Sequence, residues 1–553
     1  MGIPLYFKII SEKYPEIIRD NIDNKDSLFL DLNCAIHPCC RKVIEDSGNI
    51  DTERLEKRMI NEVLRYIEKL FLLVNPKLLY IAIDGVAPCA KMNQQRLRRY
   101  KTILDKNNID KIKKEEDIET SESWNTNAIS PGTEFMTKLS KSIKHELLNN
   151  LSYKGIQVYF SDSTVPGEGE HKILDFIKNN DLKNDIVIYG LDADLIILSF
   201  VSHKNNIFLL REALEFGKPV LDRFLYLDID NLKYFLVKDI QEKILIKDPT
   251  LLFDIDKLNN ILDDYIFISF LIGNDFLPHL LAFNLRENGL NILLDTYVEL
   301  YVIYEQNLIS KNSINWDFLK VYFNELKNIE GDLLVKMSKK RQRFKLHRKY
   351  EDAYSQKMDL LNNYPILHLE KEKYIDIGRK NWKYRFYRKA MGIYDSDDLE
   401  DCCLNYLEGL NWTFNYYFKG CKSWDYIYNN RHCPSLNDLI ATMNKFNLKS
   451  NITTKQTKPY SHIVQLLAIF PKKSINLIPK EYRKLITKEL MEYYPESFEI
   501  DTYYKRYMWQ CEPILPLINF EKINKLVKKV KSDIVLTPSE IFTINEGVGN
   551  HNN

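Results

Sequence analysis

Two pairs of acidic residues have the types and spacing in this sequence that most directly suggest chemistry. Glu168 and Glu170 flank a glycine in TVPGEGEHKI, and Asp192 and Asp194 repeat this spacing in GLDADLIIL, beside an apolar run. At about 4 Å and an effective dielectric constant near 20, two carboxylates repel each other by roughly 4 kcal/mol. A protein that gathers such groups therefore needs a cation to offset the repulsion.

Three further acids stand in or beside apolar segments: Asp31 in SLFLDLN, Asp84 in LLYIAIDG and Asp275 in FISFLIGNDFLPHLL. Each acid taken singly has a structural explanation, such as capping a helix or complementing the helix dipole. As a set they favour a centre of two Mg²⁺ ions, with Mn²⁺ able to substitute, because carboxylate oxygens are hard ligands. Two such ions support phosphodiester hydrolysis. The predicted metal ligands and catalytic residues are Asp31, Asp84, Glu168, Glu170, Asp192, Asp194 and Asp275.

A cationic helix face follows the second of these acidic segments. In KMNQQRLRRY, Lys91, Gln95, Arg98 and Arg99 fall at i, i+4, i+7 and i+8, which is one face of a helix. A solvated face and a phosphate pocket explain this pattern equally well. The position of Lys91, seven residues after Asp84, favours the phosphate pocket.

Short apolar runs alternate with helical patterns in the first half of the chain. Strands are expected at 27–33, 78–85, 156–162 and 185–192, with intervening helices that include 54–73 and 135–148. This alternation predicts an α/β fold with a largely parallel, doubly wound sheet. Sites in such sheets lie beyond the carboxyl ends of the strands, where several of the seven acids stand.

The composition is that of a globular protein. The chain has 553 residues, a net charge of +1 and nine cysteines without a CxxC pair, which argues against a zinc site. It shows no secretory signal and no long uncharged apolar run, so we expect no membrane association and a reduced, intracellular protein. The cytoplasm is the expected compartment, with the nucleus as the alternative.

Several segments resemble the conserved blocks of the XRN family of 5′→3′ exoribonucleases. In the first half they are MGIPLYFKIISEKYP, LFLDLNCAIH, YIAIDGVAPCAKMNQQRLRRY, NAISPGTEFM, VPGEGEHKI, GLDADLIIL and FLIGNDFLPHL. Later ones are YLEGLNWTFNYYFKGCKSW, KPYSHIVQLLAIFP and LPLINF. The resemblance covers most of the chain and is that of a short member containing the catalytic region only.

The resemblance implies roles for individual residues. The seven acids match the family's metal-binding positions, and Lys91, Gln95, Arg98 and Arg99 would grip the 5′ monophosphate of the substrate. His37 would stack on a base, opposite either Trp424 or Tyr426. Cys89 replaces a residue that is often basic in the family. The other tryptophans considered, Trp382, Trp412 and Trp509, are expected in the core.

The expected organisation is a PIN/FEN-like nuclease core at 1–300 with a surface insertion at about 101–128. A basic linker or helical connection at 301–369 follows, then a mainly helical second conserved region at 370–520 that packs on the core, and a tail at 521–553.

The expected function is Mg²⁺-dependent, processive 5′→3′ hydrolysis of single-stranded RNA that bears a 5′ monophosphate, releasing nucleoside 5′-monophosphates. We expect a monomer. Two alternatives remain open: a flap-type structure-specific DNA nuclease, and an inactive RNA-binding scaffold. The first would carry a helix-hairpin-helix module after Asp275, which the sequence does not show, and the second would tolerate loss of the acids.

Overall fold

A mixed, mostly parallel sheet forms the centre of the computed structural model, which describes residues 6–532 except 24, 49, 120–123, 183, 191, 216–217 and 453. Its strand order is β1-β7-β6-β5-β2-β3-β4 within the described part of the chain. The bounds are β1 Ile18–Arg19, β2 Ser27–Asp31, β3 Leu78–Ala82, β4 Gln157–Ser161, β5 Ile186–Tyr189, β6 Ile207–Glu215 and β7 Lys218–Asp228. The predicted α/β fold class is confirmed.

The four predicted strands are β2, β3, β4 and β5, and they pair in parallel. In register, Asp31 faces Ala82, and Ala82 faces Ser161, so these strands end at the same edge of the sheet. The sequence reasoning missed β6, which is parallel to β5, and the antiparallel strands β7 and β1 beyond it.

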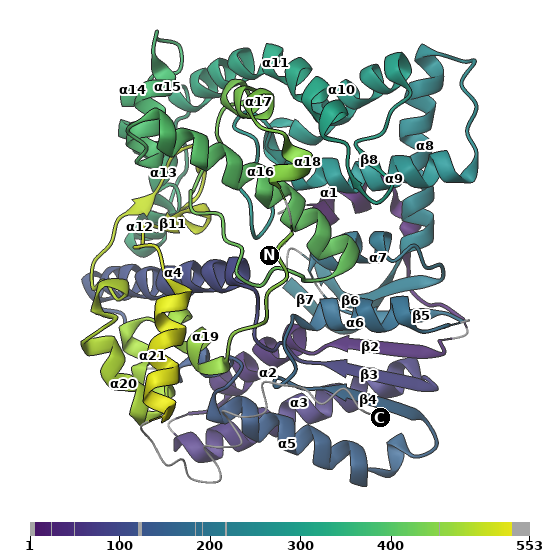
Figure 1. Ribbon diagram of the computed structural model, residues 1–553. Helices are drawn as coiled ribbons and strands as arrows, with labels where there is room; N and C mark the ends of the chain where they lie inside the picture. The colour runs from purple at the N-terminus through teal and green to yellow at the C-terminus, as the bar shows by residue number, and fades with distance from the viewer. Residues whose placement is uncertain are drawn as a thin grey trace.

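Helices cover both faces of the sheet because the side chains of its buried strands alternate between two hydrophobic clusters. Leu28 and Leu30 belong to the cluster under α2 Asn33–Asp46, α3 Thr52–Val74 and α5 Glu134–Asn149. Phe29, between them, belongs to the cluster that includes α6 Gly169–Asn179 and α7 Ala193–Val201. The two sets of helices lie on opposite sides of the sheet in Figure 1. The predicted helices 54–73 and 135–148 correspond to α3 and α5.

The rest of the described chain is mainly helical and shares the second cluster, which includes residues from Tyr6 to Tyr503. No described helix combines the length and the apolar character needed to cross a bilayer. The remaining helices, with the short N-terminal one, are α1 Tyr6–Lys13, α8 Ile229–Lys247, α9 Ile255–Phe270, α10 Gly289–Tyr304, α11 Trp316–Gln342, α12 Ala353–Asn362, α13 Tyr364–Leu367, α14 Glu370–Ile375, α15 Trp382–Phe386, α16 Ser396–Lys419, α17 Leu436–Lys445, α18 Leu448–Asn451, α19 His462–Ile469, α20 Lys480–Thr487 and α21 Phe520–Ser532. Two short hairpins, β8 Ile309–Ser310 with β9 Ser313–Ile314 and β10 Ile500–Asp501 with β11 Glu512–Pro513, complete the described strands.

A single long helix, α4 Cys89–Glu115, contains both the cationic face and the first half of the predicted insertion. The first residues of α4 pack in a third hydrophobic cluster with α19, α20 and α21. Figure 1 shows these three helices gathered along one side of α4. Residues 521–532 of the predicted tail therefore form most of a packed helix, and residues from 533 onward lie outside the described part.

The loops that follow β3 and β4 run side by side and are joined by backbone hydrogen bonds. Gly85 N donates to Gly167 O at 2.9 Å, and Gly167 N donates to Val86 O at 2.8 Å. A Cβ atom on Gly85 would lie 1.8 Å from Val165 O, which only a glycine avoids. Gly167 adopts a φ of +107°, in the region that favours glycine. This bridge fixes the distance between the chain at Asp84 and the chain at Glu168.

Replacing Gly85 tests the bridge. Gly85→Ala forces the Val165 backbone to move, so we expect the free energy of unfolding to fall by about 1–3 kcal/mol. The measurement is the midpoint of urea unfolding. The matched control is Gly331→Ala in α11, where a Cβ meets nothing within 4 Å and alanine is the better helix former. Equal midpoints for the two variants would contradict the proposed close approach.

Candidate active site

The seven predicted acids lie beyond the carboxyl ends of the strands and interact with one another. Asp31 ends β2, Asp84 follows β3 by two residues, and Asp275 lies in the loop after α9. The other four stand at helix starts: Glu168 and Asp192 at the N-caps of α6 and α7, and Glu170 and Asp194 in their first turns. Electrostatic contacts link Asp31 to Asp84 and Asp192, Asp84 to Glu168, Glu170 to Asp194, and Asp194 to Asp275.

The start of α6 brings two of these acids together. Gly169 N donates to Asp84 Oδ1 at 2.7 Å. A Cβ atom on Gly169 would lie 2.7 Å from Asp31 Oδ1, so a larger residue would push that carboxylate away. In the Gly-Glu-Gly-Glu segment, the backbone at Gly169 thus lies very close to the carboxylates of Asp31 and Asp84.

Lys91 lies inside the acidic cluster. Its Nζ is 2.8 Å from Asp275 Oδ2 and 2.5 Å from Glu168 Oε2, and its side chain is only 13% exposed. Burial lowers the pKa of Lys91, but Asp275 and then Glu168 outweigh it and raise that pKa well above its ordinary value. Burial raises the pKa values of Glu168 and Asp275, yet Lys91 brings both below their ordinary range. Within this structure, the lysine that was predicted to bind phosphate is the counter-ion of two of the acids.

For the remaining buried acids, burial and the neighbouring carboxylates outweigh the positive charge of Lys91. Burial, followed by the charge of Asp84, raises the pKa of Asp31 to about 8. Burial, followed by the charge of Asp275, raises the pKa of Asp194 to about 7. Burial, followed by the charge of Asp194, raises the pKa of Glu170 well above its ordinary value. Asp31 Oδ1 and Glu170 Oε2 are buried and find no hydrogen-bond partner among the described residues.

These orphaned oxygens fit divalent cations, which would supply the missing charge and the missing ligand contacts. The described His, Cys, Asp and Glu side chains nevertheless do not form a group of three or more already arranged around a common metal position. The carboxylates that could bind the ions are therefore close together, but Lys91 occupies part of the space between Glu168 and Asp275.

A buried arginine stands further along the same helix. Arg99 donates from Nη2 to Ser130 Oγ at 2.7 Å and from Nη1 to Gln95 O at 3.2 Å. Its Nε is buried without a partner among the described residues, and so is Gln95 Oε1. Burial, followed by the neighbouring charge of Arg98, lowers the pKa of Arg99 to about 9. An anion beside Arg99 would relieve both the electrostatic cost and the unsatisfied donor.

His37, on α2, faces the same cations. Loss of hydration lowers its pKa to about 4, with further contributions from Arg98, Arg99 and Arg41, although part of its side chain stays exposed. His37 is therefore neutral at pH 7, and its ring lies near the arginines that the sequence assigned to phosphate binding. A neutral ring in this place can stack on a base without adding charge.

The backbone of Trp424 contacts the first residue of α4. Its carbonyl accepts a hydrogen bond from Cys89 N at 2.8 Å, and its own N donates to Thr457 Oγ1 at 2.8 Å. Tyr426 is used for packing instead: its ring stacks on that of Trp412 at 5.2 Å, and its hydroxyl donates to Asn405 O. The structure thus favours Trp424 over Tyr426 as a stacking residue, and its pairing with His37 stays a prediction.

The expectation for the other tryptophans was partly wrong. Trp412 is buried in the core as expected, and Trp382 is partly buried and packs against the same hydrophobic cluster. Trp509 is 48% exposed. It lies in the short 3-10 helix Met508–Gln510 at the surface, so its size alone did not indicate burial.

Sequence reasoning missed two residues that shape the site. Tyr416, on α16, donates to Glu168 Oε1 at 2.6 Å. Lys172, on α6, donates to Ile83 O at 2.7 Å and to Asp162 O at 3.0 Å, so it ties together the loops after β3 and β4. The one feature of the sequence that could have indicated this role is that Lys172 falls on the apolar face of its helix.

Comparison with known proteins follows the same division of the chain. The family model described as the XRN 5′-3′ exonuclease N-terminus matches residues 1–213. The one described as the Xrn1 helical domain matches residues 254–373 and 368–546, which is more than half of the chain.

Curated relatives align over nearly all of this chain. 5′-3′ exoribonuclease 1 of Homo sapiens is 30% identical over 95% of this chain and 34% of its own length. The protein of the same name from Saccharomyces cerevisiae is 30% identical over 98% of this chain and 44% of its length. 5′-3′ exoribonuclease 2 of Arabidopsis thaliana is 27% identical over 98% and 68%. The chain spans about a third to a half of the length of the exoribonuclease 1 relatives. Because family models match both the sheet with its acids and the helical part, the chain belongs to the XRN 5′-3′ exonuclease family.

Proposed function

We propose that the chain is a 5′→3′ exoribonuclease that removes nucleoside 5′-monophosphates from single-stranded RNA with a 5′ monophosphate. The observation that carries this proposal is the placement of two complementary sites along α4. Lys91 stands among the carboxylates, and Arg99, about 12 Å further along the helix axis, has a buried Nε without a partner. The names of the curated relatives support the same activity.

The anion site would select the end of the RNA. Arg99 is held by Ser130 and by the Gln95 carbonyl, so its guanidinium is oriented before substrate arrives. A terminal phosphate carries more charge than an internal one, and an arginine binds it through several N–H groups at once. With the terminal phosphate fixed there, the bond presented to the carboxylates would be the first one of the chain.

The carboxylates would hold the catalytic ions. When bound, two Mg²⁺ ions would provide an activated water and a counter-charge for the departing 3′ oxygen. Asp31, Asp84, Glu168, Glu170, Asp192, Asp194 and Asp275 are the residues that would hold them. Lys91 would share Glu168 and Asp275 with those ions, and Tyr416 would keep Glu168 oriented.

Base recognition would be independent of sequence. A neutral His37 ring and the Trp424 ring offer stacking surfaces, and stacking contributes about 1–3 kcal/mol per base without distinguishing the four bases. Repeated refilling of the phosphate site by each new 5′ end would make degradation processive.

The activity assay uses the purified chain, Mg²⁺, and matched RNA and DNA strands that carry a 5′ monophosphate, triphosphate or hydroxyl. We expect mononucleotides from monophosphorylated RNA alone. Asp194→Asn should lower the rate by at least about 100-fold, the scale of removing one charge-stabilising group from an active site. Asp181→Asn, at an exposed position away from the cluster, is the control. Cleavage of a branched DNA flap would favour the DNA nuclease, and binding without cleavage would favour the scaffold.

The phosphate site has its own test. Arg99→Gln removes the charge that would bind the 5′ monophosphate, so kcat/KM on monophosphorylated RNA should fall about 10- to 100-fold. The preference over 5′-hydroxyl RNA should fall with it. Lys106→Gln, at an exposed position of the same helix, should change neither. A variant that loses rate equally on both substrates would show that Arg99 acts elsewhere.

The stability of the metal-free protein should depend on pH. Because the pKa values of Asp31 and Asp194 are raised to about 8 and about 7, these two groups hold more protons in the folded state than in the unfolded state from about pH 4 to 8. Buried histidines such as His37 have the opposite effect below about pH 6.5. In EDTA, the melting temperature should therefore fall as the pH rises from about 6.5 to 8. Excess Mg²⁺ should reduce the slope, and Asp31→Asn should reduce it without Mg²⁺. A melting temperature that rises from about pH 6.5 to 8 in EDTA would contradict the raised pKa values of the two carboxyls.

A further inference from the structure

A second site lies beside α4, on a helix face that neighbours the one carrying Lys91 and Arg99 and shares Arg98 with it. It is a cleft of about 570 Å³ between α4, the 272–287 loop and the 504–517 segment. Asn274 and Asp275 line it, so it adjoins the acidic cluster. Its lining contains nine Lys or Arg residues and three Asp or Glu residues, which makes it strongly cationic. Apart from Asp275, the proposed mechanism uses no residue that lines this cleft.

Part of the positive charge is neutralised within the protein, and part is not. Lys340 pairs with Glu287 at 2.8 Å, and Arg341 pairs with Glu372. Arg286 and Lys505 make no ion pair with any described carboxylate. These two cations can therefore face an anionic ligand, although Lys505 is also close enough to Asp501 to lower the pKa of that carboxyl.

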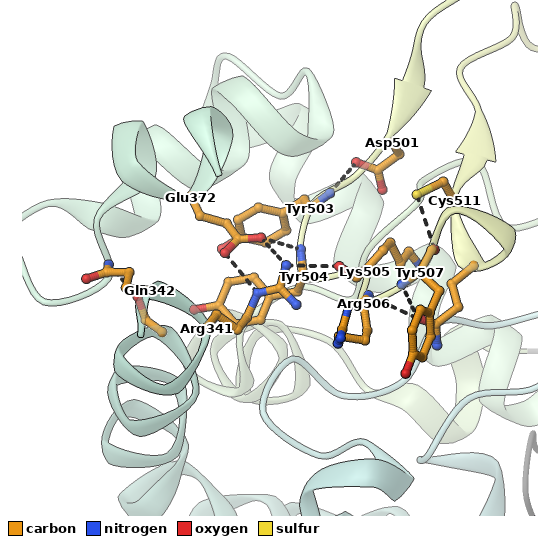
Figure 2. A network of polar contacts seen from close by, with 12 residues as sticks. Arg341, Gln342, Glu372, Asp501, Tyr503, Tyr504, Lys505, Arg506, Tyr507 and Cys511 are labelled. Carbon is orange, nitrogen blue, oxygen red and sulfur yellow. Dashed lines mark hydrogen bonds and ion pairs between the residues drawn. The ribbon is translucent and has the colours of Figure 1, made fainter. Parts of the chain in front are cut away.

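A buried network fixes the wall that carries Lys505 (Figure 2). Arg341 donates to Glu372 from Nε at 2.9 Å and from Nη2 at 2.6 Å, and also from Nη2 to Lys505 O at 2.9 Å. Glu372 Oε1 in turn accepts from Tyr504 N at 3.1 Å. The side chains of Arg341 and Glu372 are 11% and 4% exposed, so this pair is a rigid support for the wall.

Aromatic rings and arginines alternate at the outer end of the cleft. The guanidinium of Arg506 lies 4.2 Å from the ring centre of Phe344 and 4.4 Å from that of Tyr507. The rings of Tyr507 and Trp509 are 6.3 Å apart and nearly parallel, with Arg286 over both. Trp509 is 48% exposed, so one face of this stack is open. Exposed aromatic rings among arginines are the surfaces on which bases stack.

Three residues that line the same cleft have buried polar atoms without partners. Gln94 Oε1, Asn274 Nδ2 and Arg431 Nε are buried and find no hydrogen-bond partner among the described residues. Leaving such groups unsatisfied is costly, and a ligand with both donors and acceptors would satisfy them. The edge of a nucleobase and a phosphate oxygen have these groups.

We propose that this cleft binds one nucleoside 5′-monophosphate and receives the reaction product as it leaves the carboxylates. The cations match the phosphate, the open ring of Trp509 matches the base, and the volume is that of a small-ligand site, too small for a long strand. Asp275 lines the cleft, so the cleft begins beside one of the carboxylates that would act on the RNA. This inference rests on the proposed exonuclease function.

Binding is tested without catalysis. AMP and UMP are titrated into the full chain in EDTA by calorimetry, with inorganic phosphate as the comparison ligand. We expect saturable binding that weakens about tenfold or more in Trp509→Ala, the loss of one base stack. The double variant Arg286→Gln/Lys505→Gln should weaken it similarly. Lys389→Gln, an exposed lysine outside the cleft, and Arg99→Gln should retain the cleft binding.

The product role is tested by comparing single-turnover with multiple-turnover hydrolysis of 5′-monophosphorylated RNA. Trp509→Ala should leave the single-turnover rate unchanged. The multiple-turnover rate and the inhibition of hydrolysis by added AMP should both change. Both rates unchanged would overturn the product role.

Three binding results would overturn the cleft site: AMP binding that cleft variants leave intact, loss of all binding in Arg99→Gln alone, or phosphate binding as tight as AMP. A wild-type chain that binds AMP in the cleft but hydrolyses no RNA would instead overturn the proposed exonuclease function and, with it, the product role.

Discussion

Repulsion among seven carboxylates at one edge of a sheet is the constraint on which the rest of this structure depends. Acids placed so close would spread apart unless the backbone held them and cations offset their charge. The protein provides the first through the Gly85–Gly167 bridge and the close approach at Gly169. It provides the second only in part, because Lys91 compensates Glu168 and Asp275 and leaves Asp31 and Glu170 with orphaned oxygens.

The helical half of the chain is part of this arrangement. Asp275 comes from the loop after α9, Tyr416 comes from α16, and Gln465, on α19, accepts a hydrogen bond from Ala87 N just before α4 begins. Four of the acids, Asp31, Asp84, Glu168 and Glu170, lie before the end of α6, and the start of α7 adds Asp192 and Asp194. The orientation of these acids nevertheless relies on groups that follow residue 213. The two parts of the chain also share one hydrophobic cluster, which holds them together.

The sequence predicted those features that follow from local patterns. Buried runs gave β2, β3, β4 and β5, and acids at the ends of those runs had to meet because parallel strands share an edge. The missed features depend on contacts between distant segments. The length and antiparallel pairing of β7, the position of Lys91 among the acids, and the exposure of Trp509 all follow from tertiary packing that periodicity does not encode. The boundaries of the predicted domains stay predictions.

The continuity of α4 limits how this region can change in evolution. Lys91 and Arg99 are on one uninterrupted helix, so inserting or deleting a single residue between them would rotate one relative to the other by about 100° and shift it by 1.5 Å. Either change would turn Arg99 away from Ser130 and break the alignment of the two charged sites. We therefore expect this stretch not to accept changes in length, whereas the far end of the same helix carries no part of either charged site.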